Sequence, residues 1–373
     1  MRPIKDIGSV RGKKVLLRLD LNVPLRNEEV ADDFRIKKSI PTIQWLREGG
    51  AKIIIISHCE NKDTPTLRPV FKYLAQTLPI SFIETYVDEK THEAVDALQD
   101  GEMILLENLR QYDGEKQNDR AFASMLASLA HVYVNDAFSV SHREHASIVG
   151  IPNIIPGYAG FLLQREVENL SKSFNAPHPF LFILGGAKFD TKIPLIKKFL
   201  TIADTVFVGG ALANNFFKEQ GYNVGRSLVS DGDFSLNELL KDKKIILPID
   251  VVVRRGEKID IKNIASVGDE DMILDAGPET LEMLNQGISS AQYILWNGPL
   301  GNFEVGFKEG TLLLAQKIAQ SSAQSVLGGA DTLAAISELQ LEEKFTFVSS
   351  GGGAMLDFLS SGTLPGIEAL HEK

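Results

Sequence analysis

Short, nearly continuous apolar runs alternate along this chain with stretches of helical periodicity, and no other feature constrains the fold as strongly. An apolar run without polar alternation is typical of a parallel strand that is buried on both faces. Strand, helix and strand in succession make βαβ units, from which parallel sheets are built. The predicted strands are 15–20, 52–57, 103–106, 132–136, 180–184, 205–208, 245–249, 293–296, 325–327 and 345–348.

Between these runs lie segments whose apolar residues recur at helical spacing. One such stripe consists of Ile36, Ile40, Ile43 and Leu46, and another of Ala121, Met125 and Leu129. The length of 373 residues suits two domains at about 150 residues each. Pro152 and Pro156 interrupt the pattern near mid-chain, and a helical stretch follows. We therefore expect an α/β fold with two doubly wound parallel-sheet (Rossmann-like) domains, 1–160 and 177–358, joined by a hinge helix at 161–176.

Composition excludes several classes of protein. The net charge of −10 and the pI of about 5.3 argue against a nucleic-acid partner. The longest aliphatic run, 53–56, is far short of the ~20 apolar residues of a membrane helix. The chain has one cysteine, Cys59, so it has no internal disulfide framework, which fits a reducing, cytoplasmic setting.

Glycine pairs follow the predicted strands of the second half, where parallel sheets bind ligands. They are Gly185-Gly186, Gly209-Gly210, Gly328-Gly329 and the run Gly351 to Gly353. Each precedes a predicted helix and would present backbone N–H groups to an anion. Tight strand-to-helix turns also use glycine, but four such junctions favour a polyphosphate ligand.

Charged residues accompany these glycines. Lys188 and Lys192 would share one helix face near its N-terminus, and the alternative is a pair of surface lysines. Asp331 could hold Mg²⁺ against phosphate oxygens, or cap a helix. The chain has neither G-x-x-x-x-G-K-[ST] nor G-x-G-x-x-G, so it is not an ordinary P-loop enzyme and not a clear Rossmann dehydrogenase.

The first half carries polar side chains at its strand ends instead. Candidates for holding a small anion are Arg18, Asp20, Asn22, Arg35, His58, Arg110, His142, Arg143 and His145. Arginine binds carboxylates and phosphates through a rigid fork of donors. For any one of these arginines taken alone, a solvated surface charge is the usual explanation.

Taken in order, these segments resemble the phosphoglycerate kinase family over nearly the whole chain. The matching segments are 18–24 (RLDLNVP), 32–36 (DDFRI), 107–110 (ENLR), 135–138 (NDAF), 142–147 (HREHAS), 184–188 (LGGAK) with Lys192, 296–299 (WNGP) with Phe303 and Glu304, 328–331 (GGAD), 351–353 (GGG) and 364–366 (LPG).

The resemblance implies reversible phosphoryl transfer from 1,3-bisphosphoglycerate to ADP, giving 3-phosphoglycerate and ATP with Mg²⁺. It implies that Asp20, Asn22, Arg35, His58, Arg110 and Arg143 bind the phosphoglycerate. The implied nucleotide-binding residues are Gly186, Lys192, Gly209, Gly210, Asn297, Pro299, Glu304, Gly329, Ala330, Asp331 and Thr332, with Glu304 on the ribose and Asp331 on the metal. Arg35, Lys188, Gly351 and Gly352 would act on the transferring group. The resemblance also implies a monomer, no membrane or nucleic-acid partner, and a C-terminal tail, 359–373, that returns to the first domain.

The chemistry of the residues agrees with this reaction. A carboxylate acceptor is already ionised at pH 7, so no general base is required, and the sequence offers no catalytic triad. The remaining task is to position the groups and neutralise charge, with closure of the domains excluding water.

The chain departs from the family pattern at two places. The usual Ser-His-Leu-Gly-Arg-Pro is replaced by 57–62 (SHCENK), so Asn61 stands for the arginine and Glu60 adds a negative charge. Lys62 or Arg68 could compensate. Ala330 stands where the family usually has glycine, and it would be strained if its φ were positive.

Three alternatives remain open at this point. The altered segment at Glu60 and Asn61 would suit a kinase of the same fold that acts on a different acid. A non-catalytic nucleotide-binding protein would bind ATP without turnover. A dinucleotide oxidoreductase would bind NAD, although its glycine motif is absent.

Overall fold

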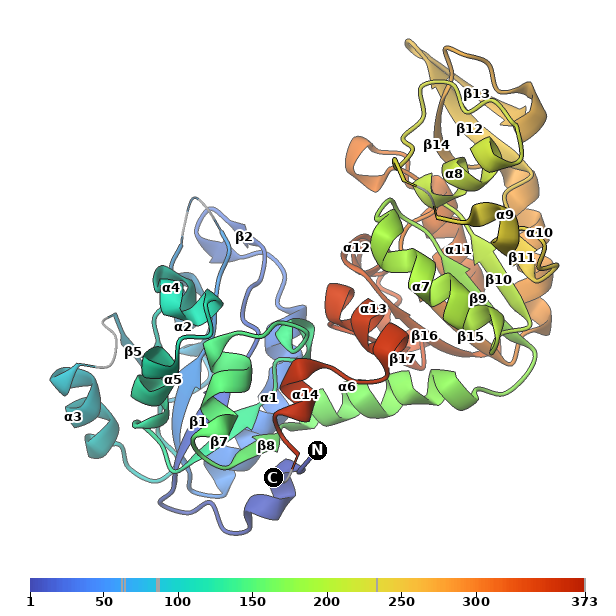
Figure 1. The fold of residues 1–373 in the computed structure, drawn as a ribbon. Coiled ribbons are helices and arrows are strands. Elements are labelled where there is room, and N and C mark those ends of the chain that lie inside the picture. Colours follow the sequence, from blue (N-terminus) through green and yellow to red (C-terminus); the bar gives the residue numbers. More distant parts are fainter. Residues whose placement is uncertain (62, 64, 85–87, 233, 372–373) are drawn as a thin grey trace. The chain divides into compact units, whose positions relative to one another are not determined.

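The computed structural model describes residues 1–373 except 62, 64, 85–87, 233 and 372–373. The chain forms two compact units, shown in Figure 1. Unit 1 comprises Met1–Glu168 and Ser361–Lys373, and unit 2 comprises Asn169–Ser360. Among the described residues, no helix combines the length and apolar character that crossing a bilayer demands.

Unit 1 is built on a six-stranded, wholly parallel sheet in the order β5-β6-β4-β1-β7-β8. Its strands are β1 (Lys14–Arg18), β4 (Lys52–Ile56), β5 (Ile80–Ile83), β6 (Met103–Leu106), β7 (Val132–Asn135) and β8 (Gly157–Ala159), beside a small hairpin of β2 (Leu25–Arg26) and β3 (Glu29–Val30). Its α-helices are α1 (Phe34–Glu48), α2 (Arg68–Leu74), α3 (Glu89–Ala97), α4 (Asp113–Lys116), α5 (Arg120–Ala127) and α14 (Pro365–Glu368). Its short 3₁₀ helices are η1 (Ile4–Ile7), η2 (Leu109–Gln111), η3 (Phe138–Val140) and η5 (Ile151–Asn153), and η4 (Ala146–Gly150) is a short π-helix.

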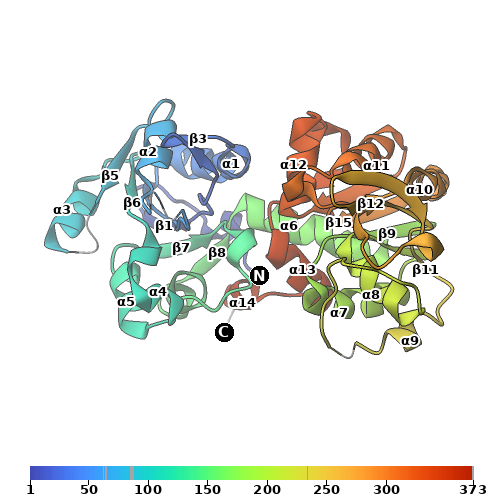
Figure 2. The same cartoon turned by 90° about the horizontal axis from the view of Figure 1, so that it is seen from above.

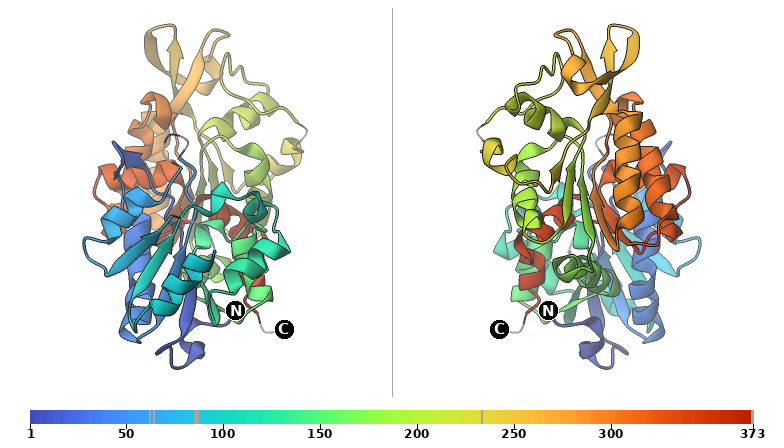
Figure 3. Two further views of the ribbon diagram at one scale, coloured as in Figure 1. Left: turned by 90° about the vertical axis from the view of Figure 1, so that its left-hand side faces the viewer. Right: turned by 90° about the vertical axis from the view of Figure 1, so that its right-hand side faces the viewer.

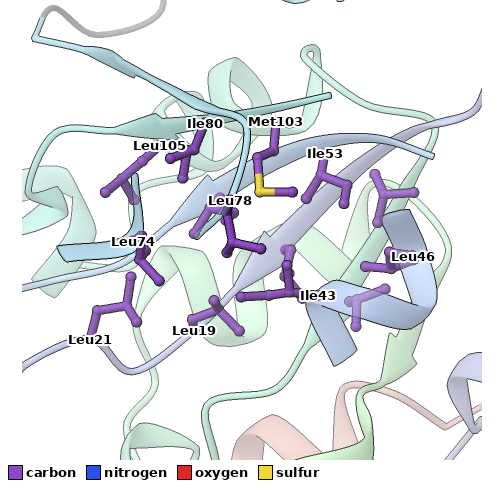
Figure 4. Packing of buried hydrophobic residues seen from close by; sticks show 14 of the residues in the cluster. Leu19, Leu21, Ile43, Leu46, Ile53, Leu74, Leu78, Ile80, Met103 and Leu105 are labelled. Atoms are coloured by element: carbon purple, nitrogen blue, oxygen red, sulfur yellow. The ribbon is translucent and has the colours of Figure 1, made fainter. Parts of the chain in front are cut away.

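The continuous apolar runs of these strands place buried side chains on both faces of the sheet. Figure 2 shows α1 and α2 on one side and α4 and α5 on the other. Figure 4 shows the packing on the α1 side, where Ile43, Leu46, Ile53 and Leu105 belong to one buried cluster. These four side chains are essentially inaccessible to water. Because all the strands run in the same direction, the polar residues that follow them lie at one edge of the sheet.

Unit 2 repeats the design, with the strand order β11-β10-β9-β15-β16-β17, again all parallel. The strands are β9 (Phe180–Leu184), β10 (Thr205–Val208), β11 (Ile245–Ile246), β15 (Tyr293–Asn297), β16 (Gln324–Gly328) and β17 (Phe347–Val348). The helices are α7 (Phe189–Leu200), α8 (Ala211–Glu219), α9 (Leu236–Leu239), α10 (Pro278–Ser290), α11 (Glu309–Gln320), α12 (Ala330–Glu338) and α13 (Gly352–Ser361). Figure 3 shows the helices of this unit on both sides of its strands.

Unit 2 also contains an antiparallel sheet in the order β13-β12-β14. Its strands are β12 (Asp250–Arg255), β13 (Lys258–Asn263) and β14 (Met272–Ala276). Elsewhere the unit has short 3₁₀ helices, which are η6 (Lys172–Asn175), η7 (Ile264–Ser266), η8 (Phe303–Val305) and η9 (Glu342–Lys344). We did not expect this sheet. The alternation of polar and apolar residues over 258–263, next to Gly256, is the hairpin signal that would have revealed it.

The segment expected to be a hinge helix contains α6 (Phe161–Ser171), and the boundary between the two units falls within it. Asp136 anchors the start of this helix, because its Oδ1 accepts the N–H groups of Leu162 at 2.8 Å and Leu163 at 3.2 Å. The C-terminal residues lie on unit 1, where Gly366 N donates to Ser141 O at 2.8 Å and Arg2 N to Leu370 O at 3.1 Å.

Some predicted elements need correction. The strands expected at 245–249 and 345–348 are confined to 245–246 and 347–348, because each lies at a sheet edge with a neighbour on one side only. The stripe expected on α5 is wrong at Ala121, and its buried residue Leu129 lies beyond the end of the helix at Ala127. Ala121 is exposed, and the buried residues of this helix are Phe122, Ala123, Leu126 and Ala127. Phe122 has the largest apolar side chain of the helix, so the face that carries it is the one that turns inward.

A matched pair of isoleucines tests the core of unit 1. We expect Ile55→Ala to lower the free energy of unfolding of this unit by about 2–5 kcal/mol, because a fully buried side chain leaves a cavity. Ile154→Ala, at a side chain 43% exposed, should lower it by less than about 1 kcal/mol. Urea unfolding followed by Trp45 fluorescence in a Trp296→Phe background measures both. Equal effects would contradict the assignment of the core.

Candidate active site

The carboxyl edge of the unit 1 sheet brings a set of charged side chains together. Asp20 follows β1 and is buried, and its Oδ2 lies 3.0 Å from Arg35 Nη1. The same guanidinium nitrogen donates to Asn22 O at 2.8 Å, and the Ser139 hydroxyl donates to Asp20. Burial alone would raise the pKa of Asp20, but attraction by the Arg35 guanidinium and the hydrogen bond from Ser139 lower it below its usual value. Asp20 is therefore a carboxylate that fixes Arg35 in place.

His58 follows β4 and is almost fully buried. Its Nδ1 lies 3.2 Å from Arg18 Nη2. A guanidinium can only donate, so Nδ1 accepts and the imidazole proton is on Nε2. Burial, and then repulsion by Arg18 and Arg110, lowers the pKa of His58 well below its usual range, despite the opposing attraction of Asp20. His58 is thus neutral at pH 7, and its 3.8 Å approach to Asp20 is not an ion pair.

Arg110 and Arg143 converge on one carboxylate. Glu60 Oε1 lies 2.9 Å from Arg110 Nη1 and 3.2 Å from Arg143 Nη1. The Nε and Nη2 of Arg110 are buried and have no hydrogen-bond partner among the described residues. Burial, followed by repulsion from Arg110 and Arg143, lowers the pKa of His145 to about 4. The local potential is therefore positive, and the open donors suit an anionic ligand.

All six residues predicted to bind the acid belong to this one cluster in unit 1. Asp20 contacts Arg35, Arg35 contacts Asn22, and the Asn22 side chain accepts the Glu60 N–H at 3.0 Å. Through Glu60 the chain of contacts reaches Arg110 and Arg143, while His58 lies beside Asp20.

Other residues of the cluster were not predicted. The Ser139 hydroxyl on η3 supports Asp20, while Ser147 Oγ accepts from Arg18 Nε at 2.9 Å and donates to Glu115 Oε1 at 2.6 Å. These partners lie far along the chain from the groups they support, and the sequence gives no signal for them. Of the two candidates to replace the missing arginine, Arg68 pairs with Glu84 instead, and Lys62 lies outside the described residues.

In unit 2 the glycine-bearing loops surround a cavity of about 280 Å³ at the carboxyl edge of the sheet. Five of the residues predicted to bind nucleotide line it, namely Gly186, Gly210, Pro299, Glu304 and Asp331. Of the other six, Lys192 lies on α7, whereas Gly209, Asn297, Gly329, Ala330 and Thr332 belong to the strand-to-helix segments that carry these lining residues. Thr332 Oγ1 accepts from Gly298 N at 3.0 Å and so holds the loop after β15.

Lys192 is buried beneath these loops, and its Nζ donates to Gly185 O. A Cβ at Gly186 would lie 2.8 Å from this Nζ, and a Cβ at Gly298, where φ is +93°, would lie 2.9 Å from it. Glycine is required at both positions because φ is positive (+82° at Gly186), and a Cβ at Gly298 would also lie 2.5 Å from Gly185 O. Burial lowers the pKa of Lys192 to about 8, with Asp331 opposing the shift and Lys188 adding to it.

Lys188 does not share a helix face with Lys192, contrary to expectation. It is the exposed N-cap of α7, which begins at Phe189, so it lies outside the helix.

The helix cap expected at Asp331 is also wrong. Gly329, with φ of +111°, is the N-cap of α12, and Asp331 lies within the first turn. The positive φ falls on Gly329, and Ala330 is helical without strain.

The start of α13 holds the last of the predicted catalytic glycines. Gly351 N already donates to Ser349 Oγ at 3.1 Å, and Gly351 O accepts the N–H of Met355 at 2.6 Å. Gly352 is the first residue of α13, where backbone N–H groups have no acceptor within the helix. The N–H of Gly352 is therefore better placed than that of Gly351 to meet an anion.

Comparison with known proteins agrees with this arrangement. A profile described as phosphoglycerate kinase matches residues 4–362. The phosphoglycerate kinase of Dictyoglomus turgidum is 41% identical over 383 residues, covering 98% of this chain and 97% of the relative. That of a Wolbachia strain is 43% identical over 387 residues, covering 98% and 97%. The chain belongs to the phosphoglycerate kinase family.

Solved structures support the assignment. The structure of phosphoglycerate kinase from Coxiella burnetii aligns with a TM-score of 0.82 at 36% identity, over 97% of this chain and 96% of that one. The crystal structure of the enzyme from Pyrococcus horikoshii aligns with a TM-score of 0.88 at 31% identity, over 99% and 98%. The two doubly wound parallel sheets expected from the sequence are thus confirmed as the fold of this family.

Several lining residues of the cavity in unit 2 escaped prediction because they come from the antiparallel sheet. Val251 of β12 and Met272, Leu274 and Asp275 of β14 form an apolar wall with one buried acid. Burial raises the pKa of Asp275 to about 6, although its carboxylate accepts from Gly310 N and Ala276 N. An apolar wall opposite the glycine loops suits a flat, weakly polar ligand group.

Lys192 should give the protein a pH-dependent stability. Its pKa is about 8 in the folded state and 10.5 when unfolded. The unfolded chain therefore binds more protons between these values, so the free energy of unfolding rises with pH across that window, by roughly 3 kcal/mol. We expect Lys192→Met to remove this rise, and the exposed neighbour variant Lys197→Met to keep it. Chemical unfolding at pH 8 to 10.5 measures the slope, and equal slopes would contradict the burial of the ammonium.

Proposed function

We propose that this chain catalyses reversible phosphoryl transfer between 1,3-bisphosphoglycerate and ADP, giving 3-phosphoglycerate and ATP. It is a phosphotransferase with a carboxyl group as acceptor. The observation that carries the proposal is the pairing of an arginine-rich anion cluster on one unit with a glycine-lined cavity on the other. A kinase for a different acid and a non-catalytic nucleotide-binding protein are not favoured.

In unit 1, Arg110 and Arg143 would bind the phosphate of the acid, since Arg110 has buried donors with no partner among the described residues. Neutral His58 would donate from Nε2, because Nδ1 already accepts from Arg18. Asn22 would add a polar contact. Arg35, fixed by Asp20, would face the carboxyl end of the substrate. The charge and the open donors of these groups support each of these roles.

In unit 2, the loops at Gly186, Gly210 and Gly329 would hold the phosphates of ADP or ATP through backbone N–H groups. Glu304 would bind the ribose, and the base would lie on the apolar wall. Lys192 would hold the glycine loops in place beneath the nucleotide, and Lys188 would reach the transferring phosphoryl group.

Asp331 would bind Mg²⁺ together with phosphate oxygens. The described residues contain no group of three or more histidine, cysteine, aspartate or glutamate side chains able to hold a metal alone. A single carboxylate on the cavity lining fits Mg²⁺, which is usually held by one or two carboxylates, the substrate phosphates and water. When bound, the ion would neutralise phosphate charge.

The transfer itself needs no proton. In the direction of ATP use, a carboxylate oxygen of 3-phosphoglycerate forms a bond to the γ-phosphorus, the bond from that phosphorus to the β–γ bridging oxygen breaks, and ADP leaves with the electron pair. Lys188, Arg35 and the Gly352 N–H would neutralise the charge on the transferring group. Because acid and nucleotide bind to different units, closure of the units about α6 would bring them into line and exclude water. We also propose that the chain acts as a cytoplasmic monomer, as its resemblance to the family suggests.

Lys188→Ala tests the catalytic proposal. In a coupled assay with ATP, Mg²⁺ and 3-phosphoglycerate, kcat should fall about a hundredfold or more, because a charge at the transferring group is lost. Lys197→Ala, nine residues along α7, is the matched control and should turn over normally. Wild-type protein that binds ATP but shows no turnover at saturating acid would contradict the proposed activity.

Asp331→Asn tests the metal proposal. Loss of the carboxylate should raise the Mg²⁺ concentration for half-maximal activity by about tenfold. Titration of Mg²⁺ at fixed ATP measures it, with Asp357→Asn on α13 as the charge-matched control. An unchanged Mg²⁺ requirement would remove Asp331 from the metal site.

A further inference from the structure

Glu60 takes up donors that an anionic ligand would otherwise use. One oxygen, Oε1, lies 2.9 Å from Arg110 Nη1 and 3.2 Å from Arg143 Nη1. The backbone holds the residue in this place, because the Glu60 N–H donates to Asn22 Oδ1 at 3.0 Å. The side chain is 46% exposed, so it can leave the arginines for solvent without repacking the core.

The contact of Glu60 with Arg110 and Arg143 offsets part of the positive charge of the cluster. Arg110 is nine-tenths buried, and burial lowers its pKa while Glu60 raises it again. Repulsion from both arginines also helps to hold His58 and His145 neutral. The unliganded cluster therefore gains from any carboxylate that reaches it, and Glu60 is attached to the chain at high effective concentration.

We propose that Glu60 is a built-in counter-ion that the acid substrate must displace, so that this residue sets the KM for that substrate. The inference rests on the proposed function, since it assigns Arg110 and Arg143 to the phosphate of the acid. A phosphate that carries two charges can replace a carboxylate on two guanidinium groups. A monoanion gains less from the exchange, so Glu60 favours dianionic ligands over small monoanions.

The opposite role for Glu60 makes the opposite prediction. If the carboxylate held the two arginines in the geometry that the substrate needs, its loss would weaken substrate binding. The partly exposed contacts favour the first role, because Asp20 is a buried residue that orients Arg35, whereas Glu60 is open to solvent. The sign of the change in KM therefore decides between a displaced counter-ion and an orienting group.

The experiment compares wild type with Glu60→Gln, which keeps the size of the side chain and removes its charge. Glu93→Gln on the exposed face of α3 is the control for the loss of one negative charge. At saturating MgATP, the KM for 3-phosphoglycerate should fall about three- to tenfold in Glu60→Gln, with the effect in KM rather than kcat. It should stay at the wild-type value in Glu93→Gln. A KM that is unchanged or higher in Glu60→Gln overturns the proposal.

A second arm does not depend on catalysis. Sulfate, a dianion of similar shape to phosphate, is titrated calorimetrically into the three proteins without nucleotide. Glu60→Gln should bind sulfate about three- to tenfold more tightly than wild type and Glu93→Gln do. If none of the three proteins turns over 3-phosphoglycerate but Glu60→Gln binds sulfate more tightly than the other two, the proposed function fails while Glu60 remains the counter-ion of an anion site. If sulfate binding does not tighten, the counter-ion proposal fails whatever the activity.

Discussion

The pairing of buried arginines with a few carboxylates at the carboxyl edge of the unit 1 sheet governs the chemistry of this chain. Guanidinium groups brought so close together repel one another and must be compensated. Asp20 holds Arg35, Glu115 supports Arg18 through Ser147, and Glu60 joins Arg110 to Arg143. The compensation is incomplete at Arg110, which keeps two buried donors without partners among the described residues. A site of this kind is stabilised further by an anionic ligand.

Unit 2 meets the same demand for anion binding with main chain in place of side chains. Its loops are glycine-rich because backbone and a buried ammonium occupy the space that side chains would take. One example is Lys192, whose Nζ would lie 2.8 Å from a Cβ at Gly186 and 2.9 Å from a Cβ at Gly298. The apolar wall from the antiparallel sheet completes the cavity. Side-chain forks on one unit and backbone N–H groups on the other thus divide the recognition of two anionic ligands.

The sequence predicted the parallel sheets and the chemistry-bearing strand ends, because continuous apolar runs and the residues that follow them are local signals. It could not predict partners brought together by tertiary structure, such as Ser139 with Asp20, or Ser147 with Arg18. The antiparallel hairpin left a local signal at Gly256 that was missed. The prediction for the face of α5 was wrong because the stripe of Ala121, Met125 and Leu129 omits Phe122, which the structure buries. The roles of individual site residues stay predictions.

The central claim is that this chain moves a phosphoryl group to the carboxyl group of a phosphorylated acid. An acyl phosphate reacts with hydroxylamine to give a hydroxamate and inorganic phosphate, which a phosphate ester does not do under mild conditions. The direct measurement is therefore to incubate the protein with MgATP, 3-phosphoglycerate and hydroxylamine and to quantify hydroxamate and ADP. The account predicts one hydroxamate for each ADP formed. ADP release without hydroxamate would contradict it, because the phosphoryl group would then have gone to a hydroxyl group or to water.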